Sequence, residues 1–278
     1  MDHRADVPGE RRLLLRAVTA PVLLVDVTDR VATLTLNRPD SRNALNAALS
    51  NALWDAVADA GADDGVDVVV ITGSDPAFCA GVDLKEVSGE VAPSAAVVPR
   101  RGPDGLYRFL PVIDKPVIAA VNGVCVTGGL ELALQCTFLV ASDRARFADT
   151  HARVGILPGG GMTVLLPQAI GLRRAVEMSL SGNFVAADEA LRIGLVNHVV
   201  PHDELLPFTR RLAGDLVSSD QGVVRRLLDQ YRRVAAAASL SEAHALEGLM
   251  AESQHLDRTG VGARREQVQA LGREQSSE

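Results

Sequence analysis

Three short, uninterrupted runs of apolar residues constrain the fold of this chain more than any other feature. They are Val68–Thr72, Pro116–Val121 and Phe138–Ala141. Runs of this kind are typical of strands buried on both faces of a parallel sheet. Because strands that alternate with helical segments indicate βαβ units, the middle of the chain is expected to form an α/β fold around a parallel sheet.

The segments around these runs predict the remaining elements. Val22–Val27 and Val31–Leu36 are β-rich and separated by a short polar turn, which suggests a hairpin. Asn46 is expected to cap a helix that runs to about Ala60. One face of this helix is apolar, with Leu49, Leu53, Val57 and Ala60. Later helices are predicted over Leu205–Val217, Gly222–Ala237 and Ser241–Leu256, with another in the tail to Gln269.

We therefore expect three parts along the chain. Residues 1–20 form a flexible N-terminal extension, residues 21–202 form the α/β core, and residues 203–278 form a helical C-terminal region that serves oligomerisation. Residues 86–105 interrupt the core with a long, weakly patterned stretch rich in Gly, Pro, Ser and Ala. Insertions of this kind often act as lids over a binding site.

Charge and composition exclude several classes of function. The 278-residue chain carries a net charge of −7 and no basic cluster, which argues against nucleic-acid or membrane-surface partners. No window approaches the ~18 apolar residues of a membrane span, and charges interrupt the only apolar patch near the N-terminus. A cytoplasmic location is therefore the default expectation. Cys79, Cys125 and Cys136 lie far apart in apolar runs, which favours buried, reduced thiols over a disulfide framework or a zinc site.

Two glycine-containing stretches carry the functional signal. Phe78–Leu84 and Asn122–Leu132 each follow one of the predicted strands. Small residues leave backbone N–H groups accessible, and one N–H from each stretch could bind the negative oxygen of an enolate. Glu131 lies one helical turn beyond the second glycine step, where a proton-transfer group would be needed. The helix dipole also favours a glutamate there, so the glycine context decides for catalysis.

These stretches and further motifs in the same order resemble the enoyl-CoA hydratase/isomerase (crotonase) family over roughly residues 22–200. The further motifs are Asn37-Arg38-Pro39, Asn43-Ala44-Leu45-Asn46, Lys115–Gly123, Gly155–Gly161 and Ala186–Val196. The resemblance implies a crotonase-like spiral of βαβ units with a helical C-terminal region. It also implies acyl-CoA thioester substrates and assembly into a homotrimer or a dimer of trimers. No cofactor and no metal are expected, since coenzyme A enters as part of the substrate.

The resemblance also implies roles for individual residues. The N–H groups of Val82 and Gly128 would form the oxyanion hole, and Glu131 would be a catalytic acid/base. The residues implied to bind the CoA end of the substrate are Ala80, Val82, Asp83, Leu84, Lys85 and Gly128. Lys85 could contact a phosphate or stay solvated, and Arg38 is better explained as a turn residue paired with Asp40.

His151 is the departure from the family pattern. Hydratases of the family place a second glutamate at this position, counted back from Gly155. Histidine can do general acid–base chemistry near neutral pH, so a Glu131/His151 pair could orient a water and relay a proton. His151 could also be a pocket wall only, and Asp149 could orient or replace it.

The leading functional prediction is an enoyl-CoA hydratase, a lyase that adds water across the 2,3 double bond of an acyl-CoA thioester through an enolate. Two alternatives stay open. One is another crotonase-fold reaction on acyl-CoA, such as isomerisation, thioester hydrolysis or decarboxylation, and the other is a non-catalytic acyl-CoA-binding subunit. The sequence does not report acyl chain length. Candidates for the apolar walls of the acyl pocket are Trp54, Tyr107, Phe109 and Leu110. Packing in the protein core would explain each of these residues equally well. The glycines at 159–161 are expected to form a tight turn into a helix.

Overall fold

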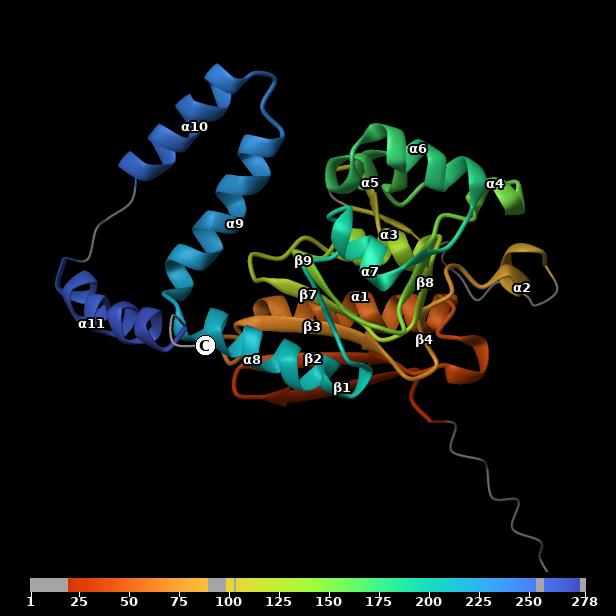
Figure 1. The fold of residues 1–278 in the computed structure, drawn as a ribbon, viewed down its shortest axis with the longest axis horizontal. Coiled ribbons are helices and arrows are strands. Elements are labelled where there is room, and N and C mark those ends of the chain that lie inside the picture. The colour runs from red at the N-terminus through yellow and green to blue at the C-terminus, as the bar shows by residue number, and fades with distance from the viewer. Residues whose placement is uncertain (1–19, 90–98, 103, 254–257, 276–278) are drawn as a thin grey trace, which may run out of the picture. The chain divides into compact units, whose positions relative to one another are not determined.

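A computed structural model of the chain describes residues 20–89, 99–102, 104–253 and 258–275. The predicted flexible extension therefore lies almost entirely outside the described residues, as does the centre of the predicted lid. The chain divides into two compact units, Met1–Ser218 and Ser219–Glu278, and each is described by itself. The larger unit contains all three sheets of the described residues, of which the two larger ones form its framework (Figure 1).

A six-stranded sheet forms the framework of the first unit. Its strands, in spatial order, are β1 (Leu23–Thr28), β2 (Val31–Leu36), β3 (Val68–Gly73), β7 (Val117–Val121), β9 (Phe138–Ser142) and β12 (His198–Val200). β1 and β2 form the predicted antiparallel hairpin, and every other pair of neighbours is parallel. The three apolar runs are β3, β7 and β9, so the prediction of a buried parallel sheet is confirmed.

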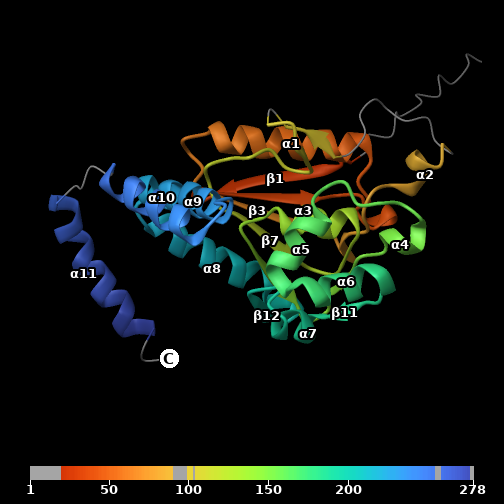
Figure 2. The ribbon, with the colours of Figure 1, turned by 90° about the horizontal axis from the view of Figure 1, so that it is seen from above.

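Helices cover both faces of this sheet, which explains why its central strands are apolar throughout. α1 (Ala47–Ala62) lies on one face and α8 (Leu205–Ser218) on the other (Figure 2). Val69 and Ile71 of β3 join the core on the α1 side, whereas Val68 and Val70 pack on the α8 side. Asn46 caps α1 as predicted, since its side-chain oxygen accepts the Leu49 N–H at 2.9 Å.

A second sheet of four short strands positions the candidate site. β4 (Ala77–Cys79), β8 (Val124–Val126) and β10 (Arg146–Ala148) are parallel neighbours, and β11 (Val185–Ala186) runs antiparallel to β10. The chain passes from the large sheet to the small one three times in succession, from β3 to β4, β7 to β8 and β9 to β10. This repeated passage is the predicted spiral. It brings the segments that follow β4, β8 and β10 to one edge of the small sheet, the edge where α/β proteins bind ligands.

The remaining elements are short strands and helices, and they include the helices predicted near the C-terminus. In the first unit they are η1 (Pro39–Ser41), α2 (Leu84–Val87), β5 (Arg100–Arg101), β6 (Tyr107–Arg108), α3 (Gly128–Leu134), α4 (His151–Val154), α5 (Met162–Ile170), α6 (Leu172–Ser181), α7 (Ala187–Arg192) and η2 (His202–Glu204). The second unit consists of α9 (Gln221–Ala235), α10 (Leu240–Glu252) and α11 (Arg258–Gln275). α8, the first helix of the C-terminal region predicted from residue 203, buries Leu205 and Ala213 against the large sheet and lies in the first unit. No helix in the described residues is both long and apolar enough to span a membrane.

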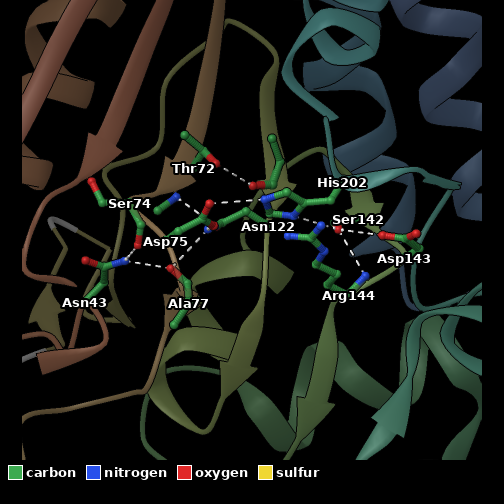
Figure 3. Close-up of polar contacts among 12 residues, drawn as sticks. Asn43, Thr72, Ser74, Asp75, Ala77, Asn122, Ser142, Asp143, Arg144 and His202 are labelled. Atoms are coloured by element: carbon green, nitrogen blue, oxygen red, sulfur yellow. Dashed lines mark hydrogen bonds and ion pairs between the residues drawn. The ribbon is translucent and has the colours of Figure 1, made fainter. Parts of the chain in front are cut away.

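Polar side chains tie together the carboxyl ends of strands in the large sheet (Figure 3). Asn122 accepts the Gly73 N–H at 3.2 Å and donates to Asp75 Oδ1 at 2.8 Å. His202 links Asp75 to Ser142, because its Nε2 atom lies 3.1 Å from Asp75 Oδ2 and its Nδ1 atom lies 3.1 Å from Ser142 Oγ. Ser142, His202 and Asp75 thus follow the order of a hydrolase triad, but Ser142 is fully buried. A serine without access to substrate cannot act as a nucleophile, so the cluster serves to fix the strand ends.

Lys115 is a buried cation that closes the C-terminal end of α1. It is 1% exposed, and Nζ donates to the carbonyl oxygens of Ala60 (2.8 Å) and Asp63 (2.7 Å). A positive charge there satisfies carbonyls that lack helical partners and complements the helix dipole. We expect Lys115→Met to lower the free energy of unfolding by about 2–3 kcal/mol in urea denaturation, because buried carbonyls lose charged donors. The exposed Lys85→Met is the control, and an unchanged midpoint in Lys115→Met would contradict the capping role.

Candidate active site

Strand register brings three distant segments of the sequence together. Cys79 of β4 is paired with Cys125 of β8, and Val126 of β8 is paired with Ala148 of β10. The residues that follow these pairs, 80–83, 127–128 and 149–151, therefore leave the small sheet side by side. Their proximity is a direct result of the spiral, and it places all four predicted catalytic residues in one region.

The N–H groups of Val82 and Gly128 lie at the meeting point of the first two segments. A Cβ atom on Gly128 would lie 3.2 Å from the Val82 nitrogen and 3.1 Å from its Cγ2 atom, so a side chain at position 128 would crowd this space. Leu45 holds the Val82 loop from both sides, since its N–H donates to the Gly81 carbonyl and its carbonyl accepts the Asp83 N–H. Within the described residues, no acceptor is bonded to the N–H of Val82 or Gly128. Both donors are therefore free to bind an anion or a polarised carbonyl.

Glu131 is held in the same region by backbone hydrogen bonds. It is 2% exposed, and its Oε1 atom accepts the N–H groups of Gly160 (2.8 Å) and Met162 (3.2 Å). Burial raises the pKa of Glu131, although these N–H groups and the nearby His151 oppose the rise. Because one oxygen is fixed by the backbone, the other is left for chemistry. A carboxylate with a raised pKa is suited to accept a proton near neutral pH.

His151 lies between two carboxylates. Its Nε2 atom is 3.8 Å from Glu131 Oε2, and its Nδ1 atom is 2.6 Å from Asp149 Oδ1. The His151 backbone N–H also donates to Asp149 Oδ1, at 3.1 Å. Burial alone would raise the pKa of Asp149, but the His151 donors and the neighbouring Ser179 hydroxyl outweigh it and lower the pKa. An ionised Asp149 accepts the Nδ1 proton and orients the ring, so that Nε2 faces Glu131.

The structure differs from the sequence prediction at Arg38. The predicted pairing with Asp40 is wrong, because Arg38 Nη2 lies 3.0 Å from Asp83 Oδ2 and its other terminal nitrogen donates to the Ala44 carbonyl. Asp83 also caps α2 through the Lys85 N–H at 3.2 Å. This pairing holds the start of α2 next to the Val82 loop, a contact between segments that local sequence cannot reveal.

The other residues predicted to bind the CoA end of the substrate are accessible. Leu84 and Lys85 are exposed, and Ala80 is half-buried with its N–H bonded to the Arg42 carbonyl at 3.0 Å. Their position beside Val82 suits a substrate that extends outward from the two free N–H groups. Their role in binding CoA stays a prediction.

The glycines at 159–161 contribute more than the sequence indicated. Gly161 caps α5 with a φ of 110°, so the prediction of a tight turn into a helix is confirmed. No sequence motif predicts that the N–H groups of Gly160 and Met162 hold Glu131. A Cβ on Gly160 would lie 3.0 Å from Glu131 Cδ, so glycine permits the close approach of backbone and carboxylate.

The cysteines and potential metal ligands offer no competing chemistry. All three cysteines are free and buried, and burial raises the pKa of Cys79 to about 12. Thiols of this kind are poor nucleophiles because they stay protonated. In the part of the chain that the structure describes, no group of three or more His, Cys, Asp or Glu side chains could hold a metal ion.

Comparison with known proteins points to one family. The enoyl-CoA hydratase/isomerase family model matches residues 26–269. A probable peroxisomal enoyl-CoA hydratase of Arabidopsis thaliana is 41% identical over 197 residues, covering 71% of this chain and 73% of the relative. A crotonyl-CoA hydratase of Syntrophomonas wolfei is 36% identical over 204 residues, which cover 73% of this chain and 78% of that relative. The crystal structure of an enoyl-CoA hydratase from Mycobacterium smegmatis aligns with a TM-score of 0.70 and 51% identity, covering 84% of this chain and 96% of that one.

Proposed function

The chain belongs to the enoyl-CoA hydratase/isomerase family, and from this premise we propose that it adds water across the 2,3 double bond of an acyl-CoA thioester. One observation supports this proposal most directly. Two free N–H groups, those of Val82 and Gly128, lie beside two proton carriers, Glu131 and His151. An enolate intermediate needs both features, since its oxygen must be stabilised while protons move at neighbouring carbons.

The two N–H groups bind the thioester carbonyl oxygen. Hydrogen bonds from Val82 and Gly128 draw electron density from the double bond, so that the carbon at position 3 becomes electrophilic. When water adds there, negative charge develops on the carbonyl oxygen, and the same donors stabilise it. Each donor of this kind contributes about 3 kcal/mol to lowering the barrier.

Glu131 and His151 divide the proton transfers. Glu131 Oε2 takes a proton from the attacking water as its oxygen bonds to carbon 3. His151 donates its Nε2 proton to carbon 2, and the enolate collapses to the 3-hydroxyacyl thioester. The proton on Glu131 then returns to His151 across their 3.8 Å separation, which restores the starting state. Asp149 stabilises the imidazolium form and fixes its orientation.

The role of Glu131 predicts that kcat/KM falls when the pH is lowered through the pKa of this carboxylate. Glu131 must be ionised, and because burial raises its pKa, the fall is expected above the value of about 4.3 for an ordinary glutamate. Initial rates measured in buffers of constant ionic strength would check the profile. Full activity at about pH 4 would contradict Glu131 as the base.

Incubation of the purified protein with crotonyl-CoA tests the proposal. Loss of absorbance of the conjugated thioester, with the mass gain of one water in the product, is the expected result. His151 stands at the position where hydratases of the family have their second glutamate. This replacement favours one alternative, double-bond isomerisation, because a different acid/base group can move a proton between different atoms of the substrate. An isomerase would convert a 3-enoyl thioester without a change of mass, and a non-catalytic subunit would bind acyl-CoA and convert nothing.

The assembly and location complete the proposal. We propose a homotrimer or a dimer of trimers that uses the helices of the second unit, resides in the cytoplasm and needs no cofactor beyond the CoA of its substrate. Family membership supports this assignment. Light scattering of the purified full-length chain would measure its mass, and a monomer would overturn the assembly.

A further inference from the structure

Phe109 packs against both backbone segments that carry the proposed chemistry. It follows the β5–β6 hairpin and is 4% exposed. Its Cζ atom lies 3.3 Å from where a Cβ on Gly128 would sit, and its Cε2 atom lies 2.3 Å from the corresponding position on Gly160. Gly128 offers an N–H to the proposed enolate oxygen, and Gly160 holds Glu131. The ring therefore fills the space that side chains on these two glycines would occupy.

Gln135 holds Phe109 in this position. Its Oε1 atom accepts the N–H groups of Phe109 (2.9 Å) and Leu110 (3.1 Å), and its Nε2 atom donates to the Gly160 carbonyl at 2.7 Å. One side chain thus joins the Phe109 segment to the Gly160 segment. The backbone at Phe109 cannot move away from the site without breaking these hydrogen bonds, and the ring itself is buried.

The direction of the substrate decides what this ring does. In the proposed function CoA extends outward past Ala80 and Lys85, with the thioester oxygen at Val82 and Gly128 and the double bond beside Glu131. Acyl carbons beyond the double bond would then continue past Glu131 on the side away from CoA. Phe109 packs against Gly160, whose N–H holds Glu131, and has little exposed surface of its own.

We propose that Phe109 closes the end of the acyl pocket and restricts the enzyme to short enoyl thioesters of the crotonyl type. This inference rests on the proposed hydratase function and gives it a substrate class. Phe109 acts by steric exclusion and takes no part in proton transfer. Longer chains would have to displace a buried ring that the Gln135 hydrogen bonds hold in place.

Acyl chain preference tests the role of Phe109. We expect the wild-type enzyme to hydrate crotonyl-CoA with a kcat/KM about 100-fold above that for decenoyl-CoA, since extra methylenes without space are strongly rejected. Phe109→Ala should raise the decenoyl-to-crotonyl ratio at least about 10-fold. Leu110→Ala is the matched control, because Leu110 is as buried as Phe109. No Leu110 atom is among those nearest to a Cβ placed on Gly128 or Gly160. Its ratio should stay that of the wild type.

Further measurements separate the possible failures. Phe109→Leu, a milder change, should move the ratio in the same direction if Phe109→Ala does not fold, as judged by circular dichroism. Equal activity of the wild type on both thioesters would overturn the proposal that Phe109 closes the acyl pocket. An unchanged decenoyl-to-crotonyl ratio in a folded Phe109 variant would overturn it as well. If the wild type converts neither thioester, the hydratase function fails. Calorimetric binding of butyryl-CoA and decanoyl-CoA would then test the role of Phe109 separately from catalysis. We expect Phe109→Ala to bind decanoyl-CoA more tightly than the wild type does, and unchanged binding would overturn the role of Phe109.

Discussion

Replacing Glu131 by glutamine is expected to lower kcat on crotonyl-CoA about 1,000-fold, because a neutral amide cannot accept the proton of the attacking water. This loss corresponds to about 4 kcal/mol of barrier. The change is otherwise conservative. The amide oxygen can still accept the Gly160 and Met162 N–H groups that now bind Oε1, so the side chain should keep its place. Steady-state rates on crotonyl-CoA measure the effect.

The stability of this variant separates a catalytic role from a structural one. The pKa of Glu131 is raised in the folded protein, so its ionised form is disfavoured there and costs stability at pH values above that pKa. Glutamine removes this cost, and the melting temperature should be equal or higher at neutral pH. Glu86→Gln is the matched control, since Glu86 also accepts a backbone N–H, that of Ala47, but lies outside the proton-transfer pair. Wild-type turnover by Glu131→Gln would refute the assignment.

The fold could be predicted where local pattern and burial agree. The three apolar runs could be identified as strands because helices cover both faces of the large sheet. Asn46 could be identified as a helix start because its side chain caps an N–H only three residues further along the chain. The packing of α8 on the large sheet could not be predicted, because its side chains contact strands that are distant in the sequence. Nothing in the residues around position 205 records those contacts.

The site could be predicted only in part, for the same reason. Val82 and Gly128 lie in stretches whose small residues signal exposed N–H groups, and Glu131 follows one of them by a helical turn. The hydrogen bonds that Gly160 and Met162 give to Glu131 join segments separated by the strands β9 and β10 and the helix α4, so no local pattern predicts them. The Asp149–His151 contact is one that the sequence offered, as one of two possible roles for Asp149. The two residues are only two apart, and they immediately follow β10.

His151→Ala should reduce kcat about 100- to 1,000-fold, the range of a lost general acid. Asp149→Asn is expected to have a smaller effect on the maximum, about 10-fold, because the imidazole stays but loses the carboxylate that stabilises its protonated form. The melting temperature of each variant is measured beside kcat. A loss of kcat in a variant that keeps the wild-type melting temperature supports these roles, and wild-type kcat in Asp149→Asn would contradict the role of Asp149.

His151→Glu tests whether this site uses the two-carboxylate arrangement of other hydratases. A glutamate at position 151 would face Glu131 and Asp149, both nearly fully buried, and like charges at such short range disfavour joint ionisation. We therefore expect little hydratase activity and reduced stability. Asp149→Asn combined with His151→Glu removes one of the three carboxylates and should recover part of both. If His151→Glu alone gained activity on crotonyl-CoA, the native pair of Asp149 and His151 would have to serve a reaction other than hydration, because a site already built for hydration would not improve when its acid is replaced.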